Sequence, residues 1–254
     1  MNRNGKSALV IGASSGGGLG EAVARRLHDA GFAVLVAGRR MDPLRALAKA
    51  LDGRALACDV TDEASIEAMF VQAGPVDVLV NAAGTTDASR LSKITREQIE
   101  SQFAMHVTAN MLLLKHATAN MVRGGAIILF SSLTAAVPGE GLAAYSCAKA
   151  ALDHLVRIAA LEFGSSGIRV NAVAPGFSPT PMTEGIFAQP AIRDLYLNAC
   201  PLGSLAVSPE QVASAVAWLA QDDCFANGDT IQLSGGAHLG RLPHLNEIRH
   251  ARRM

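Results

Sequence analysis

The stretch SALVIGASSGGGLG, residues 7–20, decides the fold of this chain. Its first residues form a short apolar run, which is typical of a strand buried on both faces of a sheet. The glycine-rich segment GASSGGGLG (12–20) follows at once, and a helical pattern begins at Leu19. Glycines let the backbone turn sharply beside a phosphate, and a helix N-terminus offers free N–H groups. This order of strand, glycine-rich turn and helix predicts a nucleotide-binding βα unit.

The same alternation continues along the chain. Short apolar runs predict strands at 7–12, 32–38, 55–58, 76–81, 126–132, 168–174 and 229–235. Longer periodic segments between them predict helices at 19–30, 42–51, 62–73, 95–121, 145–163 and 208–221. Strands that alternate with helices favour parallel βαβ units. We therefore expect one doubly wound Rossmann domain spanning 1–254, with a predominantly parallel seven-stranded sheet and helices on both faces.

Composition excludes several classes of protein. Acidic and basic residues balance at 22 each, so charge alone suggests neither a nucleic-acid nor a membrane surface. No apolar run approaches the ~20 residues that span a bilayer. The four cysteines form no CxxC pair and no cluster with zinc spacing, so no metal site is expected. Free thiols, and a first segment too short and polar for a signal peptide, favour a cytoplasmic protein.

The second predicted strand ends at Gly38, followed by Arg39 and Arg40. In a dinucleotide-binding fold this end meets the adenosine ribose, where a carboxylate suits a 2′-hydroxyl and an arginine suits a 2′-phosphate. The first acidic residue after the strand is Asp42. We therefore expect Arg39 to favour NADP, with NAD as the alternative if the arginines are merely solvated.

A tyrosine and a lysine lie four residues apart in YSCAK (145–149). Residues at this spacing share one helix face, so Lys149 is placed to act on Tyr145. A phenol has a pKa of ~10, and a nearby ammonium favours its ionised form. Ser132 ends a predicted strand, and the carboxyl ends of strands bind ligands in open α/β sheets. The alternative for the pair alone is a surface contact in which the lysine stem covers the ring.

Several motifs in order now resemble the classical short-chain dehydrogenase/reductase family. The resemblance covers roughly residues 5–238 and rests on GASSGGGLG (12–20), CDV (58–60), NAAG (81–84), SS (131–132), YSCAK, RVNAVAPG (169–176), TPM (180–182) and SGG (234–236).

The resemblance implies a role for each matched position. Ser132, Tyr145 and Lys149 match the catalytic residues of a hydride-transfer enzyme that interconverts a ketone and a secondary alcohol. Asp59 and Val60 match the pair that holds the adenine. The expected cofactor site comprises Gly12, Ser14, Ser15, Gly16, Gly18, Leu19, Gly20, Arg39, Asp59, Val60, Asn81, Ala82, Ala83, Gly84, Tyr145, Lys149, Pro175, Gly176 and Thr180.

The chain departs from the family pattern in three places. Ile11 stands where a threonine is common. The glycine-rich turn is two residues longer, and we place the insertion in the loop, because two extra helical residues would rotate the apolar face by about 200°. His106 stands where the family usually has the asparagine that sustains a helix kink and a water leading to the lysine. Its imidazole could hold that water or pass the proton, or it could simply be packed in a helix.

Loop 177–203 is expected to set substrate specificity, and its apolar residues suit a hydrophobic ketone or alcohol. Reduction of carrier-protein-linked 3-ketones is an alternative activity, and a non-catalytic cofactor sensor is an alternative class of protein. The resemblance implies a homo-oligomer, usually a tetramer, or a dimer. The tail 240–254 could cover a neighbouring active site or be disordered.

Overall fold

A computed structural model describes residues 5–203 and 205–253 of the chain. Seven strands form a single sheet in which every neighbouring pair is parallel, in the order β3-β2-β1-β4-β5-β6-β7. This is an α/β Rossmann fold, and it confirms the fold class expected from the sequence. The strands are β1 (Ser7–Ile11), β2 (Ala33–Gly38), β3 (Arg54–Ala57), β4 (Val76–Asn81), β5 (Met121–Phe130), β6 (Arg169–Pro175) and β7 (Thr230–Leu233).

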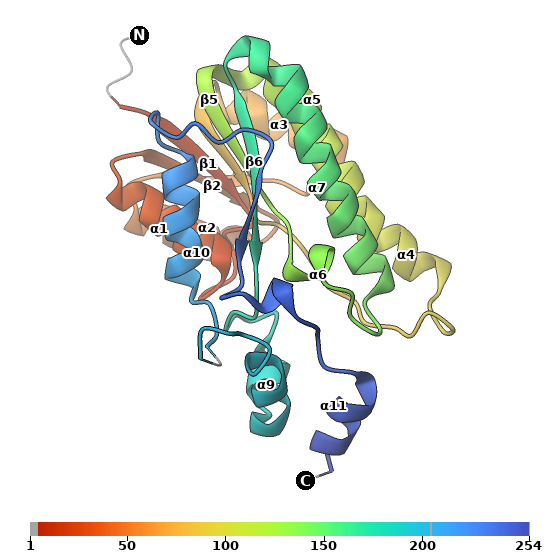
Figure 1. Cartoon of the computed structure of the whole chain (residues 1–254). Helices are drawn as coiled ribbons and strands as arrows, with labels where there is room; N and C mark the ends of the chain where they lie inside the picture. Colours follow the sequence, from red (N-terminus) through yellow and green to blue (C-terminus); the bar gives the residue numbers. More distant parts are fainter. Residues whose placement is uncertain (1–4, 204, 254) are drawn as a thin grey trace.

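Helices cover both faces of the sheet (Figure 1). One layer contains α1 (Leu19–Asp29), α2 (Met41–Ala50) and α10 (Pro209–Leu219); the other contains α3 (Glu63–Ala73), α4 (Arg96–Phe103), α5 (Ala109–Asn120) and α7 (Ala143–Phe163). Alternate residues of β1 enter different cores: Ala8 and Val10 face α1, whereas Leu9 and Ile11 face α3 and α5. This two-residue period explains why buried parallel strands are apolar along their whole length.

The helix predicted over 95–121 is interrupted in the structure. A π-helical turn, Ala104–Thr108, separates α4 from α5 and contains His106 at its centre. Single π-turns inside helices often occur at functional sites. Apolar periodicity hardly changes across one such turn, so the sequence pattern does not reveal it.

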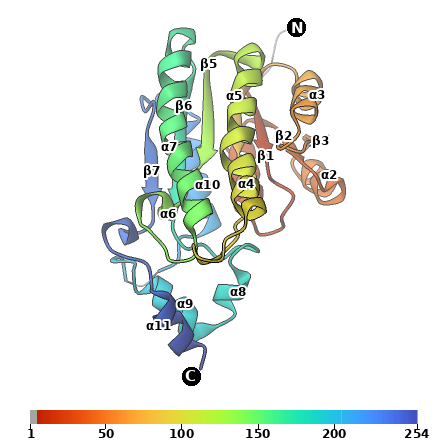
Figure 2. The ribbon, with the colours of Figure 1, turned by 90° about the vertical axis from the view of Figure 1, so that its right-hand side faces the viewer.

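Four short helices were missed by the sequence analysis: α6 (Leu133–Ala136), α8 (Glu184–Phe187), α9 (Pro190–Leu197) and α11 (Leu245–Ala251). Each is too short to show a clear period. All four lie at the carboxyl end of the strands (Figure 2). Within the tail, α11 packs against α9 of the same chain.

Within residues 5–203 and 205–253, no helix is long and apolar enough to cross a membrane. The four cysteines are free thiols. In the same described part of the chain, no group of three His, Cys, Asp or Glu residues could hold a metal ion. The cytoplasmic location stays a prediction.

Candidate active site

Gly12, the first glycine of the turn, lies directly against the backbone of Ala82 and Ala83. Gly12 has a φ of 86°, and a Cβ there would lie 2.4 Å from the backbone nitrogen of Ala83. A Cβ on Gly20 would lie 2.5 Å from the carbonyl oxygen of Gly12. Distances below 3 Å exclude a side chain at both positions. Gly20 therefore lets α1 pack closely on the end of β1, the role of the last glycine in a dinucleotide-binding turn.

The enlarged turn folds back onto the start of α1. The helix begins at Leu19, as the sequence analysis predicted, and its N-cap Gly18 provides no side-chain cap. The backbone N–H of Gly17 donates to Glu21 Oε2 at 2.9 Å, and the other oxygen of Glu21 binds Arg25 at 2.6 Å. The carboxylate thus holds the insertion while its charge is paired. Because no side chain caps the N-terminus of α1, its N–H groups are available to an anion.

The two arginines after β2 behave differently. The Arg40 guanidinium donates to Ser15 Oγ at 2.7 Å and to the Ser14 carbonyl at 3.0 Å, so it braces the glycine-rich turn. The sequence analysis gave Arg40 no role. Arg39 is exposed, and among the described residues no hydrogen bond engages its guanidinium. Its charge helps to lower the pKa of Asp59, although hydrogen bonds from Thr61 are the main cause.

A cavity of about 360 Å³ runs from the arginines past the glycine-rich turn to Thr180. The expected cofactor residues that line it are Gly12, Ser14, Ser15, Gly18, Leu19, Gly20, Arg39, Asp59, Val60, Ala82, Ala83, Gly84 and Thr180. Expected residues outside its lining are Gly16, Asn81, Tyr145, Lys149, Pro175 and Gly176. Lining residues that were not expected are Ile11, Gly38, Arg40, Cys58, Thr85, Met105, Pro181 and Met182.

Ser132, Tyr145 and Lys149 come together at the carboxyl end of β5. Ser132 caps the N-terminus of α6, where its Oγ accepts from the Thr134 N–H at 3.2 Å. Lys149 Nζ lies 5.6 Å from the centroid of the Tyr145 ring. Nζ donates to the Phe130 carbonyl at 2.6 Å. The ammonium therefore lies beneath the ring and is held by the strand that leads to Ser132.

The electrostatics differ from the expectation for this pair. Burial raises the pKa of Tyr145, and the Ser132 hydroxyl opposes this rise. Burial lowers the pKa of Lys149 to about 7, while the Asp153 carboxylate raises it. Burial is thus the main influence on the Tyr145 pKa, while the Lys149 Nζ donates to the Phe130 carbonyl.

His106 is buried between the pair and the NAAG segment, with 1% of its surface exposed. Its Nε2 lies 2.7 Å from the Thr85 carbonyl. A carbonyl only accepts, so Nε2 carries the hydrogen and Nδ1 is an acceptor. Among the described residues, Nδ1 has no partner. Burial lowers the pKa of His106 to about 3, and the charge of Lys149 contributes, so the imidazole is neutral near pH 7.

Two asparagines join the helix containing His106 to the sheet. Asn81 Nδ2 donates to Asn110 Oδ1 at 2.9 Å, and Asn110 Nδ2 donates to the His106 carbonyl at 2.8 Å. Asn81 Oδ1 also accepts from the Ala83 N–H at 3.1 Å. Asn110 thus holds the π-turn and the NAAG segment in one network. Asn110 lies one turn after His106 in the sequence, and that spacing was the available signal for its role.

A glycine-rich βα turn, an elongated cavity and a Ser–Tyr–Lys group at the carboxyl end of a parallel sheet define a dinucleotide-fold oxidoreductase. A family model described as enoyl-(acyl carrier protein) reductase matches residues 12–238. The chain belongs to the short-chain dehydrogenase/reductase family, as the sequence motifs indicated, and it acts on the alcohol/ketone pair.

Three relatives are similar over almost their whole length. A cis-4-hydroxycyclohexanecarboxylate dehydrogenase of Sinomonas cyclohexanicum is 39% identical, over 90% of this chain and 95% of its own. A 4-formylbenzenesulfonate dehydrogenase of Comamonas testosteroni is 37% identical, over 94% and 100%. A 3-oxoacyl-[acyl-carrier-protein] reductase of Rickettsia conorii is 33% identical, over 93% and 98%.

Solved structures agree with the fold. A short-chain type dehydrogenase/reductase from Mycobacterium ulcerans superposes with a TM-score of 0.89 at 29% identity, covering 98% of this chain and 97% of its own. A 3-oxoacyl (acyl-carrier-protein) reductase from Agrobacterium tumefaciens C58, solved with NADP bound, superposes with a TM-score of 0.84 at 29% identity, covering 91% and 93%.

Proposed function

We propose that this protein is an NADP(H)-dependent oxidoreductase that interconverts a ketone and a secondary alcohol, with Tyr145 as the acid and base. The observation that carries the proposal is the link from Tyr145 to the cavity through His106: the two rings lie 5.3 Å apart, and His106 Nε2 donates to the carbonyl of Thr85, which lines the cavity. The cavity is of a size that suits a bound small molecule, and the open N-terminus of α1 suits its phosphates. The nicotinamide cofactor would supply or accept the hydride.

NADP is favoured over NAD by the end of β2. Arg39 lines the cavity with its guanidinium unengaged, so it is available to a 2′-phosphate, whereas Arg40 is already used by the turn. The related structure with NADP bound agrees with this choice. Ser14, Ser15 and the N–H groups at the start of α1 would bind the pyrophosphate, and Asp59 and Val60 would flank the adenine.

The chain's own residues would carry the proton. Ser132 Oγ would donate a hydrogen bond to the substrate oxygen, and the Tyr145 hydroxyl would protonate that oxygen during reduction or deprotonate it during oxidation. Lys149 would have to leave the Phe130 carbonyl, at least in part, to stabilise the phenolate. His106 is the proposed replacement for the family asparagine. Since its pKa is about 3, it would hold a water through Nδ1 rather than carry the proton as imidazolium.

The substrate class follows from the relatives. Two of them, at 37% and 39% identity, are named for a substrate built on a six-membered ring bearing an acid group. Phe177 and Tyr196 of loop 177–203 are in contact, with ring centroids 4.2 Å apart and planes tilted by 44°, and such an aromatic pair would suit a substrate ring. A small cyclic ketone is therefore our first choice. A 3-oxoacyl-carrier-protein reductase remains the second candidate, because a relative of that name is 33% identical.

The proposal is tested with the purified protein and two cofactors. Fluorescence titration should show tighter binding of NADPH than of NADH, and 4-oxocyclohexane-1-carboxylate should be reduced with NADPH. Binding of NADPH without turnover of any ketone or alcohol would favour a non-catalytic sensor. If neither cofactor binds, the proposed function is wrong, and the enlarged turn is the first place to look.

A homo-oligomer is also proposed, as a tetramer or dimer. Large apolar side chains are exposed on the helices opposite the sheet: Met111 at 51%, Ile158 at 42% and Leu161 at 84%. These residues lie on two neighbouring helices, α5 and α7, and exposed apolar side chains there favour a partner surface over solvent. Light scattering coupled to size exclusion would give the state, and a monomeric mass at micromolar concentration would contradict the proposal.

A further inference from the structure

The C-terminal segment 241–251 contacts the segment that carries Ser132. Leu242 is 5% exposed and packs in one cluster with Leu133, Val137 and Phe177. Leu133 directly follows the catalytic serine, and Phe177 begins the substrate loop. The tail therefore reaches the two segments that flank the reacting group.

The absence of a side chain at Gly139 leaves space for Leu242 of the tail. A Cβ on Gly139 would lie 2.9 Å from Leu242 Cδ1. A side chain at 139 would therefore require at least the tip of the Leu242 side chain to shift. Leu242 and Gly139 are thus in close contact.

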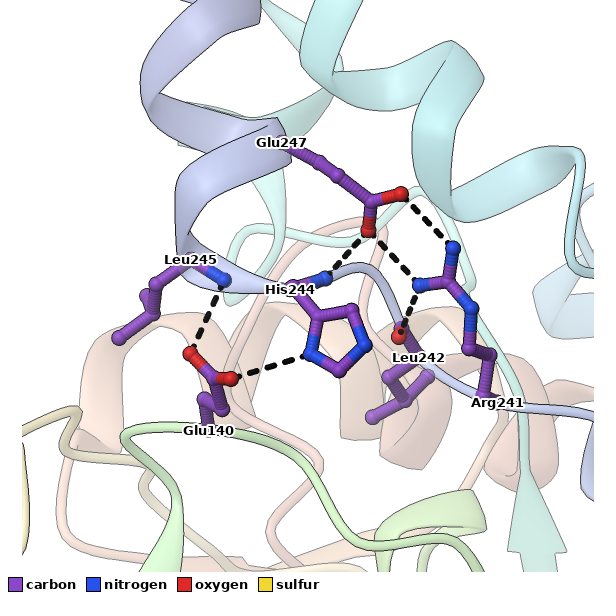
Figure 3. Close-up of polar contacts among 6 residues, drawn as sticks. All are labelled: Glu140, Arg241, Leu242, His244, Leu245 and Glu247. Atoms are coloured by element: carbon purple, nitrogen blue, oxygen red, sulfur yellow. Dashed lines mark hydrogen bonds and ion pairs between the residues drawn. The ribbon is translucent and has the colours of Figure 1, made fainter.

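Hydrogen bonds from His244 and Leu245 to Glu140, which we call the latch, hold the same tail in place (Figure 3). Glu140 accepts from the Leu245 N–H at 3.1 Å and from His244 Nδ1 at 3.0 Å. Hydrogen bonds from these two groups lower the pKa of Glu140. Arg241 binds Glu247 through two bonds of 2.7 Å, which ties the approach to α11 to the helix itself. The loop at Glu140 leads into α7, which begins two residues before Tyr145.

The other side of the tail lies against the substrate loop. Helix α11 packs on α9, which is part of loop 177–203. Figure 2 shows α9 and α11 side by side beyond the carboxyl ends of the strands. The ring of Tyr196 in α9 lies against the ring of Phe177, with the two planes tilted by 44°. The tail therefore joins the Glu140 loop to α9 across the end of the sheet at which Tyr145 lies.

We propose that segment 241–251, latched by Glu140 and His244, is a specificity-determining wall of the substrate site that admits small free ketones and excludes substrates carried on a long arm. The inference rests on the proposed function. A carrier-linked ketone must leave its arm extending out between the Ser132 side and the substrate loop. The tail joins those two sides in this chain.

The test compares two substrates with the same reacting group. Wild type, Glu140→Ala, His244→Ala and the double variant are assayed with NADPH on 4-oxocyclohexane-1-carboxylate and on acetoacetyl-coenzyme A. Glu67→Ala, an exposed glutamate on α3, is the matched control. The ratio of kcat/KM for the ring ketone to that for the thioester should fall about fivefold in each single variant, a size set by an exposed ion pair. The ratio in the double variant should match that in Glu140→Ala, since the His244 side chain acts through its contact with Glu140.

Three results would contradict the proposal. The first is a kcat/KM ratio that stays at the wild-type value in the variants, and the second is a double variant whose effect is the sum of the two single effects. The third is no thioester turnover in any variant while the ring ketone is reduced. Hydrogen exchange provides a readout independent of the reaction: amides of 133–139 and 190–197 should exchange faster in Glu140→Ala than in Glu67→Ala. If NADPH binds and neither substrate reacts, the proposed function fails, and the exchange result alone then decides whether the latch exists.

Discussion

The imidazole of His106 lies edge-on against the Tyr145 ring, with the centroids 5.3 Å apart and the planes at 81°. The hydrogen bond from Nε2 to the Thr85 carbonyl fixes the imidazole in this orientation. A residue in a π-turn between α4 and α5 thus positions the phenol on α7. The side chain at 106 affects the catalytic site both by its shape and by the acceptor Nδ1.

Two substitutions separate these effects. His106→Phe keeps a ring beside Tyr145 but removes both nitrogens, whereas His106→Asn keeps hydrogen-bonding atoms and loses the ring. If Nδ1 takes part in proton transfer, kcat should fall about 10- to 100-fold in His106→Phe and less in His106→Asn. NADPH affinity, measured by fluorescence, should change little in either variant. Equal kcat values for His106→Phe and wild type would leave His106 a packing role alone.

His106 should also make stability depend on pH. Its pKa is about 3 in the folded protein and ~6.5 when unfolded. The unfolded chain therefore binds more protons between these values, and stability falls as pH drops below about 6.5. Between pH 8 and pH 5 the loss should be about 2 kcal/mol, and His106→Asn should remove it. Urea unfolding at both pH values gives the comparison; a slope that persists in the variant would belong to other groups.

Tyr145→Phe removes only the hydroxyl oxygen from the site. Ketone reduction should fall by about 100- to 10,000-fold, the range for a lost acid–base group. Cofactor binding should stay close to that of wild type, because the Tyr145 side chain does not line the cavity. Steady-state turnover and NADPH titration on the same preparation test both parts. Activity like that of wild type would end the assignment of Tyr145.

Arg39 should discriminate between the two cofactors. Arg39→Ala is expected to weaken NADPH binding about 10- to 100-fold, as for a lost hydrogen bond to a charged group, and to leave NADH binding nearly unchanged. Arg45→Ala is the control, since that side chain is exposed and, within residues 5–203 and 205–253, pairs only with Asp42. An equal loss for both cofactors would show that Arg39 supports the loop instead of reading the 2′-phosphate.

Asp153 should tune Lys149, whose pKa is lowered to about 7 by burial and raised by this carboxylate. If cofactor binding needs the ammonium form, kcat/KM for NADPH falls as pH rises through about 7, and Asp153→Asn moves the fall to lower pH. Thr230→Val removes a hydroxyl that donates to Asp153 but keeps the charge, so its profile should move less. Identical profiles in all three proteins would assign the ionisation to another group.

The enlarged turn allows a matched pair of glycine substitutions. A Cβ on Gly20 would lie 2.5 Å from the Gly12 carbonyl, whereas one on Gly16 would meet only Glu21 Oε2 at 3.9 Å. Gly20→Ala should lower the free energy of unfolding by about 1–3 kcal/mol and weaken NADPH binding. Gly16→Ala should stay within about 0.5 kcal/mol of wild type. Urea unfolding and NADPH titration test the pair, and equal effects would mean that Gly16 belongs to the phosphate site.

By itself, the sequence determined the order of the strands and of the long helices, the parallel sheet, the start of α1 at Leu19 and the positions of Ser132, Tyr145 and Lys149. These follow from local periodicity, glycines and short motifs, which depend on near neighbours along the chain. The tertiary structure decided what distant residues do to one another. In the folded chain Lys149 donates to the Phe130 carbonyl, and Arg40, rather than Arg39, hydrogen-bonds the glycine-rich turn. His106 is buried beside Tyr145. Folding also brings Leu242 onto Gly139. Such contacts join segments far apart in the chain, so their distances and desolvation, and hence the pKa values, exist only once the chain has folded.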